Sequence, residues 1–185
     1  VGTLAADEPA GSLNYLRMID VRVEATAGWS LYYIGHTDTG AQLYRSLAIW
    51  NTVQGCEFVN NGAFGLLRMG HSCTTTVFRD CLFGGARGYS THVTYGDQVH
   101  FDNCTLEGSD DTQPYMKLVR CISSRISACR FEHHGGHGSN QDSNEQRFLV
   151  IGSGCRTITV DSCRFARNSS SNATPVAIPR IAAIG

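Results

Sequence analysis

Apolar and polar positions follow one pattern that recurs along most of the chain. Core-type residues are expected five and three positions before a cysteine, at the cysteine, and two positions after it, as in Ile158, Val160, Cys163 and Phe165. The pattern occurs in the segments 51–58, 76–83, 99–106, 124–131 and 158–165, and an earlier copy at 16–23 has valine in place of cysteine. Successive cysteines of this set lie 25, 23, 25 and 34 residues apart. Such spacing is typical of a solenoid, in which each repeat forms one coil.

Each copy contains a break in its alternation. Two residues separate the second core position from the cysteine, whereas strict strand alternation allows one. This break predicts a sharp corner with one short strand before it and another after it. The corner residues Gly55, Asp80, Asn103 and Ser162 are of types that tolerate turn geometry.

A third strand is expected between copies, at 29–34, 65–69, 92–95, 115–119 and 148–151. Most of these segments end in an apolar residue followed by glycine, as in Met69-Gly70, Tyr95-Gly96 and Ile151-Gly152, with Val119-Arg120 in the fourth coil. The same step is read in Ile34-Gly35 and in the final Ile184-Gly185. The expected outward residues are Tyr33, Leu66, Arg68, His92, Thr94, Phe148 and Val150. Because that face looks apolar, we expect it to be covered by long turns or by a sister subunit.

Three strands per coil with one abrupt bend resemble the pectin-lyase-like superfamily, which includes pectate lyases and bacteriophage tailspikes. The resemblance implies an all-β fold, a right-handed parallel β-helix (β-solenoid) of about six coils of three short strands. It covers residues 16–185, with 1–15 as an N-terminal segment or cap, and indicates part of a longer solenoid. It also implies a homotrimer of tailspike type. A sandwich of antiparallel hairpins would not hold cysteine and Phe or Leu at one offset through five copies.

Eight cysteines would suit four disulfides in a secreted domain. Their columns argue instead for reduced, buried thiols, because stacked coils hold neighbouring Cβ atoms near 4.8 Å, beyond the mean of about 3.8 Å for a disulfide. Cys73, Cys121 and Cys155 form a second, partial column eight residues before the first. Unpaired thiols favour assembly in a reducing compartment, which favours a phage virion protein over a secreted enzyme.

The net charge, the length of the apolar runs and the spacing of possible metal ligands limit the partners that this chain can bind. The net charge of −1 argues against nucleic-acid binding, because it leaves no broad basic field. Lys117 is the only lysine, and the predominance of arginine favours planar, bidentate or stacked contacts. No apolar run is long enough for membrane insertion. No zinc-type spacing occurs, and the strands expected on the third face lack the acidic residues that bind calcium in pectate lyases, so no metal or other cofactor is expected.

Two long polar turns, which begin at Glu107 and Glu132, follow the same strand in adjacent coils. Glu107 and Glu132 share one offset from their cysteines, which places them within reach of acid/base chemistry on a glycosidic bond. The surrounding candidates for substrate binding are Asp110, Asp111, Tyr115, His133 and His137. The alternative is that both glutamates are solvated turn residues.

A short motif in these turns, Gly136-His137-Gly138 following Asp110-Asp111, resembles the polygalacturonase family of the same superfamily. The Asn-Thr-Asp and Arg-Ile-Lys motifs of that family are absent.

Three functions stay open for the chain as a whole. The first is a phage tailspike or fibre that recognises, and in an enzymatic form cleaves, a bacterial surface polysaccharide. The second is a secreted polysaccharide lyase or hydrolase, and the third is a structural spacer.

Overall fold

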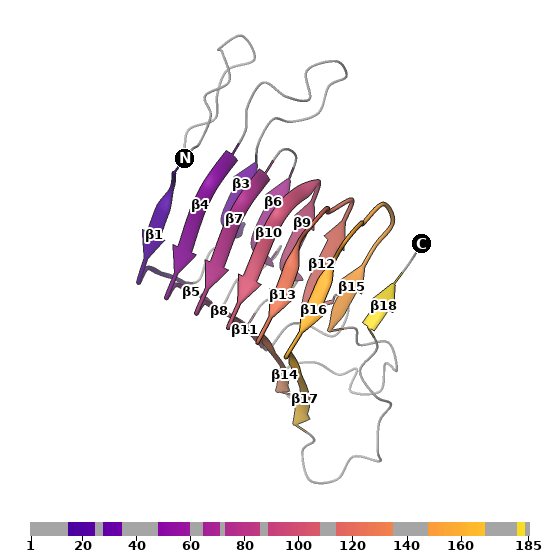
Figure 1. Ribbon diagram of the computed structural model, residues 1–185. Coiled ribbons are helices and arrows are strands. Elements are labelled where there is room, and N and C mark those ends of the chain that lie inside the picture. The colour runs from indigo at the N-terminus through magenta and orange to yellow at the C-terminus, as the bar shows by residue number, and fades with distance from the viewer. Residues whose placement is uncertain are drawn as a thin grey trace.

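The computed structural model describes residues 15–24, 28–34, 48–59, 65–70, 73–85, 89–107, 114–134, 148–168 and 181–183. Every regular element in these ranges is a strand, and the strands form three six-stranded parallel sheets, as expected for about six coils of a parallel β-helix. In Figure 1 the sheets run side by side along the solenoid, with β1 at one end and β18 at the other. No helix among these ranges is long and apolar enough to cross a membrane.

Sheet A contains the strand that precedes the cysteine of each copy. Its strands, in spatial order, are β1 (Arg17–Ile19), β4 (Ala48–Gln54), β7 (Cys73–Arg79), β10 (Gly96–Asp102), β13 (Arg125–Ser127) and β16 (Thr159–Asp161). The six strands are successive first strands of a coil, so each lies beside the strand about one coil away in sequence.

Sheet B contains the strand that follows the cysteine. Its strands are β2 (Arg22–Glu24), β5 (Glu57–Val59), β8 (Leu82–Gly84), β11 (Thr105–Glu107), β14 (Arg130–His134) and β17 (Arg164–Asn168). The corner between sheets A and B lies where the alternation of the sequence breaks.

The corner is formed by one residue per coil in the left-handed region, with φ from 52° to 62°. These residues are Asp20, Gly55, Asp80, Asn103, Ala128 and Ser162. The four predicted corner residues are thus confirmed. Gly55 also has a close neighbour, because an added Cβ would meet Oδ1 of Asp20. A side chain at Gly55 would therefore have to displace the Asp20 carboxylate, although the other five corners show that its φ alone does not require glycine.

Sheet C contains the third strand of each coil. Its strands are β3 (Trp29–Ile34), β6 (Gly65–Gly70), β9 (Tyr89–Thr94), β12 (Met116–Val119), β15 (Leu149–Ile151) and β18 (Ile181–Ala183). The predicted third strands therefore exist in the expected places, with bounds that shift by up to three residues.

The register of sheet C corrects the alignment based on the apolar-Gly step. Met69 pairs with Val93, which in turn pairs with Leu118, so Tyr95-Gly96 lies two residues beyond the step and Val119-Arg120 lies one beyond it. Ile34 pairs with Gly70, so Ile34-Gly35 is also displaced by one residue. Met69-Gly70 and Ile151-Gly152 do share a register through Leu118. Glycine beside an apolar residue was a weaker marker of register than the cysteine.

Two of the residues expected on the outer face of sheet C lie in the core. Leu66 and Phe148 are both buried, and Phe148 packs against Phe131 and Phe165 of sheet B with ring centroids 6.4 and 6.0 Å away. The expectation was wrong because consecutive residues are buried where the chain turns into sheet C, so alternation does not hold there. In the first coil, Tyr32 rather than Tyr33 pairs with the outward Arg68.

The core is filled by columns of like side chains from successive coils. Phe78 and Phe101 stack at 4.9 Å, and Phe58 and Phe83 stack at 5.3 Å. Offset-stacked rings add to the burial of their apolar area. The predicted inward offsets are therefore confirmed.

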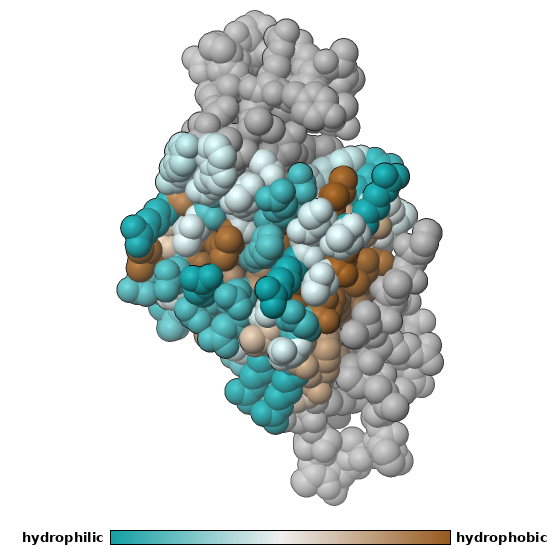
Figure 2. Space-filling model, in the orientation of Figure 1, coloured by the Kyte–Doolittle hydropathy of each residue, from teal (hydrophilic) through white to brown (hydrophobic). Residues whose placement is uncertain are grey.

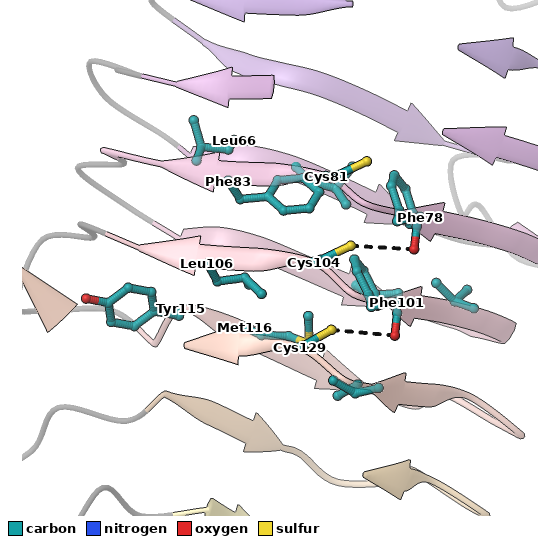
Figure 3. Close-up of a cluster of buried hydrophobic side chains, with 14 of the residues drawn as sticks. Leu66, Phe78, Cys81, Phe83, Phe101, Cys104, Leu106, Tyr115, Met116 and Cys129 are labelled. Atoms are coloured by element: carbon teal, nitrogen blue, oxygen red, sulfur yellow. Dashed lines mark hydrogen bonds between the residues drawn. The ribbon is translucent and has the colours of Figure 1, made fainter. Parts of the chain in front are cut away.

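All eight cysteines are free, as predicted, and six of them are buried while Cys155 and Cys163 at the C-terminal end are half-buried. Four of the five thiols of the main column donate a hydrogen bond to a backbone carbonyl of the preceding coil, from Cys81 to Val53, from Cys104 to Phe78, from Cys129 to Phe101 and from Cys163 to Ile126. Figure 3 shows Cys81, Cys104 and Cys129 one above another, with two of these bonds drawn. The ladder joins coils through weak thiol hydrogen bonds in addition to packing.

Candidate functional site

The outer face of sheet A is a solvated, self-paired surface. Arg79 bonds to Asp102 at 3.2 Å, Arg125 bonds to Asp161 at 2.7 Å, and the side-chain amide of Asn103 donates to Asp80 at 2.7 Å. Figure 2, which views the molecule with this sheet toward the reader, shows a mostly hydrophilic face with small hydrophobic patches. These charges are therefore matched within the face itself.

Glu107 and Glu132 lie opposite each other at the sheet B edge that leads into the longest turns. Glu107 ends β11, and the parallel register pairs it directly with Glu132 of β14. The two backbones are therefore one strand spacing apart, about 4.8 Å. Both side chains belong to the outer face, since the intervening positions Leu106 and Phe131 are in the core.

The two carboxylates have different surroundings. Glu132 is only 5% exposed, and its Oε1 lies 2.5 Å from Nη2 of Arg130 on the same strand. Glu107 is half-buried, and its Cγ and Oε1 are each 3.4 Å from the position that a Cβ on Gly84 would occupy. Glu107 therefore lies at contact distance from Gly84 of the preceding coil.

Paired carboxyl groups on adjacent coils suit acid/base chemistry on a glycosidic bond, in which one group donates a proton and the other activates water or attacks. Glu132 forms an ion pair with Arg130, while Glu107 lies above Gly84 of the preceding coil. The two carboxyl groups thus differ in exposure and in charged neighbours.

The remaining predicted site residues are only partly described. Tyr115 is 2% exposed and packs against Phe148 at a ring distance of 5.3 Å, so its ring belongs to the core. The backbone of His133 lies in β14 and pairs with Arg167. Asp110, Asp111 and His137 lie outside the described residues, as does the Gly136-His137-Gly138 word.

A second cluster of polar residues lies on the outer face of sheet C. In the strand register, Arg68 lies opposite His92, and His92 lies opposite Lys117. Three basic residues on successive coils therefore occupy one column. We call this set the basic column. Lys117 was absent from the expected outward residues, because aligning Val119 with Met69 placed Leu118 rather than Lys117 beside Arg68. Aligning the strands on the consecutive buried residues at their start would have identified Lys117 as outward.

The imidazole of His92 is held in its neutral form. Burial, followed by the positive charges of Arg68 and Lys117, lowers its pKa to about 4. At neutral pH the basic column therefore carries two charged groups with an uncharged ring between them, and this ring can both donate and accept a hydrogen bond.

No group of three or more His, Cys, Asp or Glu side chains converges as a metal site in the ranges that the structure describes. Of the acids of sheet B, Glu132 pairs with Arg130, and Glu24 and Glu57 both pair with Arg22. These residues offer proton transfer and ionic contacts as their chemistry.

Comparison with known proteins agrees with the architecture. The family described as "Right handed beta helix region" matches residues 19–176, which include nearly all of the coils. No curated protein matches the chain. The family match and the three parallel sheets together establish that the chain belongs to the right-handed β-helix family, with the coil architecture of the pectin-lyase-like superfamily.

Proposed function

We propose that this β-helix recognises a bacterial surface polysaccharide, in the manner of a phage tailspike or fibre, with Glu107 and Glu132 as its candidate acid/base pair. Asp110, Asp111, His133 and His137 are proposed to complete the contact surface in the neighbouring turns. A solenoid presents the same outward positions on every coil, which suits a polymer made of repeating units.

The observation that supports this proposal is the register-matched pair of carboxylates, of which one is nearly buried. A carboxylate is costly to bury, even with the Arg130 guanidinium beside it. Elsewhere on sheet B the ion pair between Arg22 and Glu57 is exposed on both sides, as an ordinary surface pair is.

The setting proposed for the module is the tail of a virion, with three copies side by side. Leu66 and Phe148 no longer support that trimer, since both lie in the core. The homotrimer therefore stays a prediction. Light scattering of the purified chain tests it, and a stable monomer at micromolar concentration would count against it.

The functional test is a screen of the chain against capsular and O-antigen polysaccharides, followed for each bound glycan by an assay of chain length. Glu107→Gln and Glu132→Gln are compared with Glu57→Gln, which removes an outward carboxylate from the same sheet, two strands from Glu107 and three strands from Glu132. An acid/base pair predicts that both site variants bind the glycan and fail to shorten it, while Glu57→Gln behaves as the parent does.

Each outcome has a distinct meaning. If the parent binds a glycan without cleaving it, the module is a recognition protein and the glutamates are contact residues. If Glu107→Gln and Glu132→Gln cleave as the parent does, the pair is not the catalytic site. If no glycan binds, the proposal fails and a structural spacer is the better account.

A further inference from the structure

The second cysteine column contains two thiols that lie opposite each other on adjacent coils. The bridge between Ile122 and Arg156 places Cys121 directly beside Cys155. Cys121 is buried, whereas Cys155 is half-buried. An oxidant in solvent therefore reaches one member of this pair more easily than the other.

The sulfur of Cys155 has different hydrogen-bond partners from the other half-buried thiol. The backbone N–H of Cys121 donates to Sγ of Cys155 at 3.4 Å. Cys163 instead donates to the carbonyl oxygens of Ile126 and Asp161, at 3.5 and 3.2 Å. An N–H that points at a sulfur stabilises negative charge there, whereas a carbonyl oxygen favours the protonated thiol. Because the thiolate is the form that reacts, these contacts favour oxidation of Cys155 over Cys163.

Cys121 is suited to be the second thiol of a pair. Burial raises the pKa of Cys121 to about 12, and negative charge on Cys155 adds to that rise. Cys121 therefore stays protonated while Cys155 is ionised. Oxidation of Cys155 to an uncharged sulfenic acid removes this opposing charge, so that Cys121 can then react with it.

The two residues are close enough for a disulfide. Opposite residues on adjacent strands have Cα atoms about 4.8 Å apart, within the range of about 4.4 to 6.8 Å that disulfides span. The nearest strands to Cys155 end at Ile151 and begin at Thr159, and between them Gly154 has φ of 73° in a turn. A turn can move by the distance of about 1 Å that brings the two Cβ atoms to disulfide spacing.

We propose that Cys155 is an oxidation site of the folded protein and that Cys121 completes a disulfide with it. Hydrogen peroxide is the oxidant. Sγ of Cys155 bonds to one peroxide oxygen as the O–O bond breaks, and the other oxygen leaves as water after taking up the thiol proton. Sγ of Cys121 then attacks the sulfenic sulfur, the S–O bond breaks, and the hydroxyl leaves as water with the proton of Cys121. Two thiols and one peroxide thus give one disulfide and two waters.

The disulfide would fasten the coil that carries Glu132 to the next coil. This coil is the longest, since Cys129 and Cys163 lie 34 residues apart, against 25, 23 and 25 for the earlier steps. A disulfide that needs a shift of the backbone is also easily reduced, so a thiol reductant should reopen it. The oxidation goes beyond the proposed function and requires no glycan.

The test is peroxide treatment of the whole folded chain, followed by alkylation of the remaining thiols and mass mapping of tryptic peptides without reduction. Trypsin separates the three thiols, because they fall in the peptides 121–125 (Cys121), 148–156 (Cys155) and 157–164 (Cys163). We expect a linked pair of the first two peptides, which dithiothreitol removes. Oxidation of Cys155 should be about tenfold faster than that of Cys163.

Variants assign the two roles. Cys155→Ser should abolish the linked peptides, and the matched control Cys163→Ser, which changes the other half-buried thiol, should keep them. In Cys121→Ala, dimedone, which traps sulfenic acids, should label Cys155. If that variant does not fold, dimedone present while the parent is oxidised gives the same readout, because it captures the sulfenic acid before the disulfide closes.

Two results would overturn the proposal. Equal oxidation of Cys155 and Cys163, or a Cys155 that stays fully alkylated, would show that Cys155 is not an oxidation site. A sulfenic acid on Cys155 of the parent with no link to Cys121 would refute the role of Cys121.

Discussion

The thiol of Cys129 donates a hydrogen bond to the carbonyl oxygen of Phe101, which lies one coil earlier, at a sulfur–oxygen distance of 3.6 Å. The same bond recurs from Cys104 to Phe78 at 3.5 Å. Each of these positions thus holds a small, largely apolar side chain with one weak donor, and four successive coils repeat the bond. A residue that lacks either property should disturb two coils at once.

Cys104→Asp is expected to destabilise the fold by about 4 kcal/mol or more, because it leaves an uncompensated charge in the core. Cys104→Ala should cost only about 1 kcal/mol, from lost packing and one weak hydrogen bond. Urea denaturation measures both. Thr105→Asp, at the neighbouring outward position, is the control and should stay within about 0.5 kcal/mol of the parent. A folded, equally stable Cys104→Asp variant would contradict the ladder.

Ala128→Gly is expected to stabilise the protein by about 0.5 to 1 kcal/mol. Ala128 is exposed at a corner with φ of 52°, a conformation that costs a residue with a Cβ about 1 to 2 kcal/mol and that glycine adopts freely. Thermal unfolding of the variant checks the sign. Ala166→Gly, in strand β17, is the matched control, and there the same substitution should destabilise.

Arg130→Met is expected to cost about 2 kcal/mol, because it weakens the compensation of the nearly buried Glu132 carboxylate. Arg22→Met, at the equivalent outward column of the same sheet, breaks the exposed pairs with Glu24 and Glu57 and should change stability by less than about 0.5 kcal/mol. Chemical denaturation at one salt concentration compares them. Equal effects would mean that Glu132 is no better shielded than a surface acid.

The pH dependence of stability should carry the signature of His92. Its folded pKa is about 4, below the ordinary value of 6.5, so between these values the unfolded chain binds a proton that the folded chain does not. The free energy of unfolding should therefore fall as the pH is lowered from about 6.5 to about 4. His92→Gln should flatten this fall by about 1 to 2 kcal/mol, after allowance for solvent screening of a half-buried group. A parallel pH profile in the variant would show that His92 titrates as an ordinary histidine.

Much of this fold was predictable because the cysteine of each coil combines three constraints in one residue. It is small enough for the corner, apolar enough for the core, and preceded by a left-handed residue such as Asp80 or Asn103. Those constraints repeat in every coil, so the offsets of sheets A and B followed from the sequence. Sheet C has no such marker, and the apolar-Gly step slipped by one or two residues there.

The candidate site was predictable to a smaller extent. The shared offset of Glu107 and Glu132 gave their register correctly, because offset within a coil determines register in a solenoid. It did not indicate that Glu132 is nearly buried beside Arg130, since the direction of a side chain on an outer face depends on its neighbours. Lys117 was missed for a related reason, because shifting the alignment of a strand by one residue turns outward positions into inward ones.

The thiol ladder also sets an order of events for the molecule. Burial raises the pKa of Cys121 to about 12, so this thiol in the folded chain is both shielded and protonated, and the thiolate is the form that oxidants attack. The unfolded chain exposes all eight thiols. A disulfide formed there between cysteines of different coils would hold them closer together than the stacked coils of the folded chain do. Air and peroxide are therefore harmful chiefly to a newly made or unfolded chain. Once the coils have closed, burial shields six of the eight thiols from oxidants, while Cys155 and Cys163 stay half-buried.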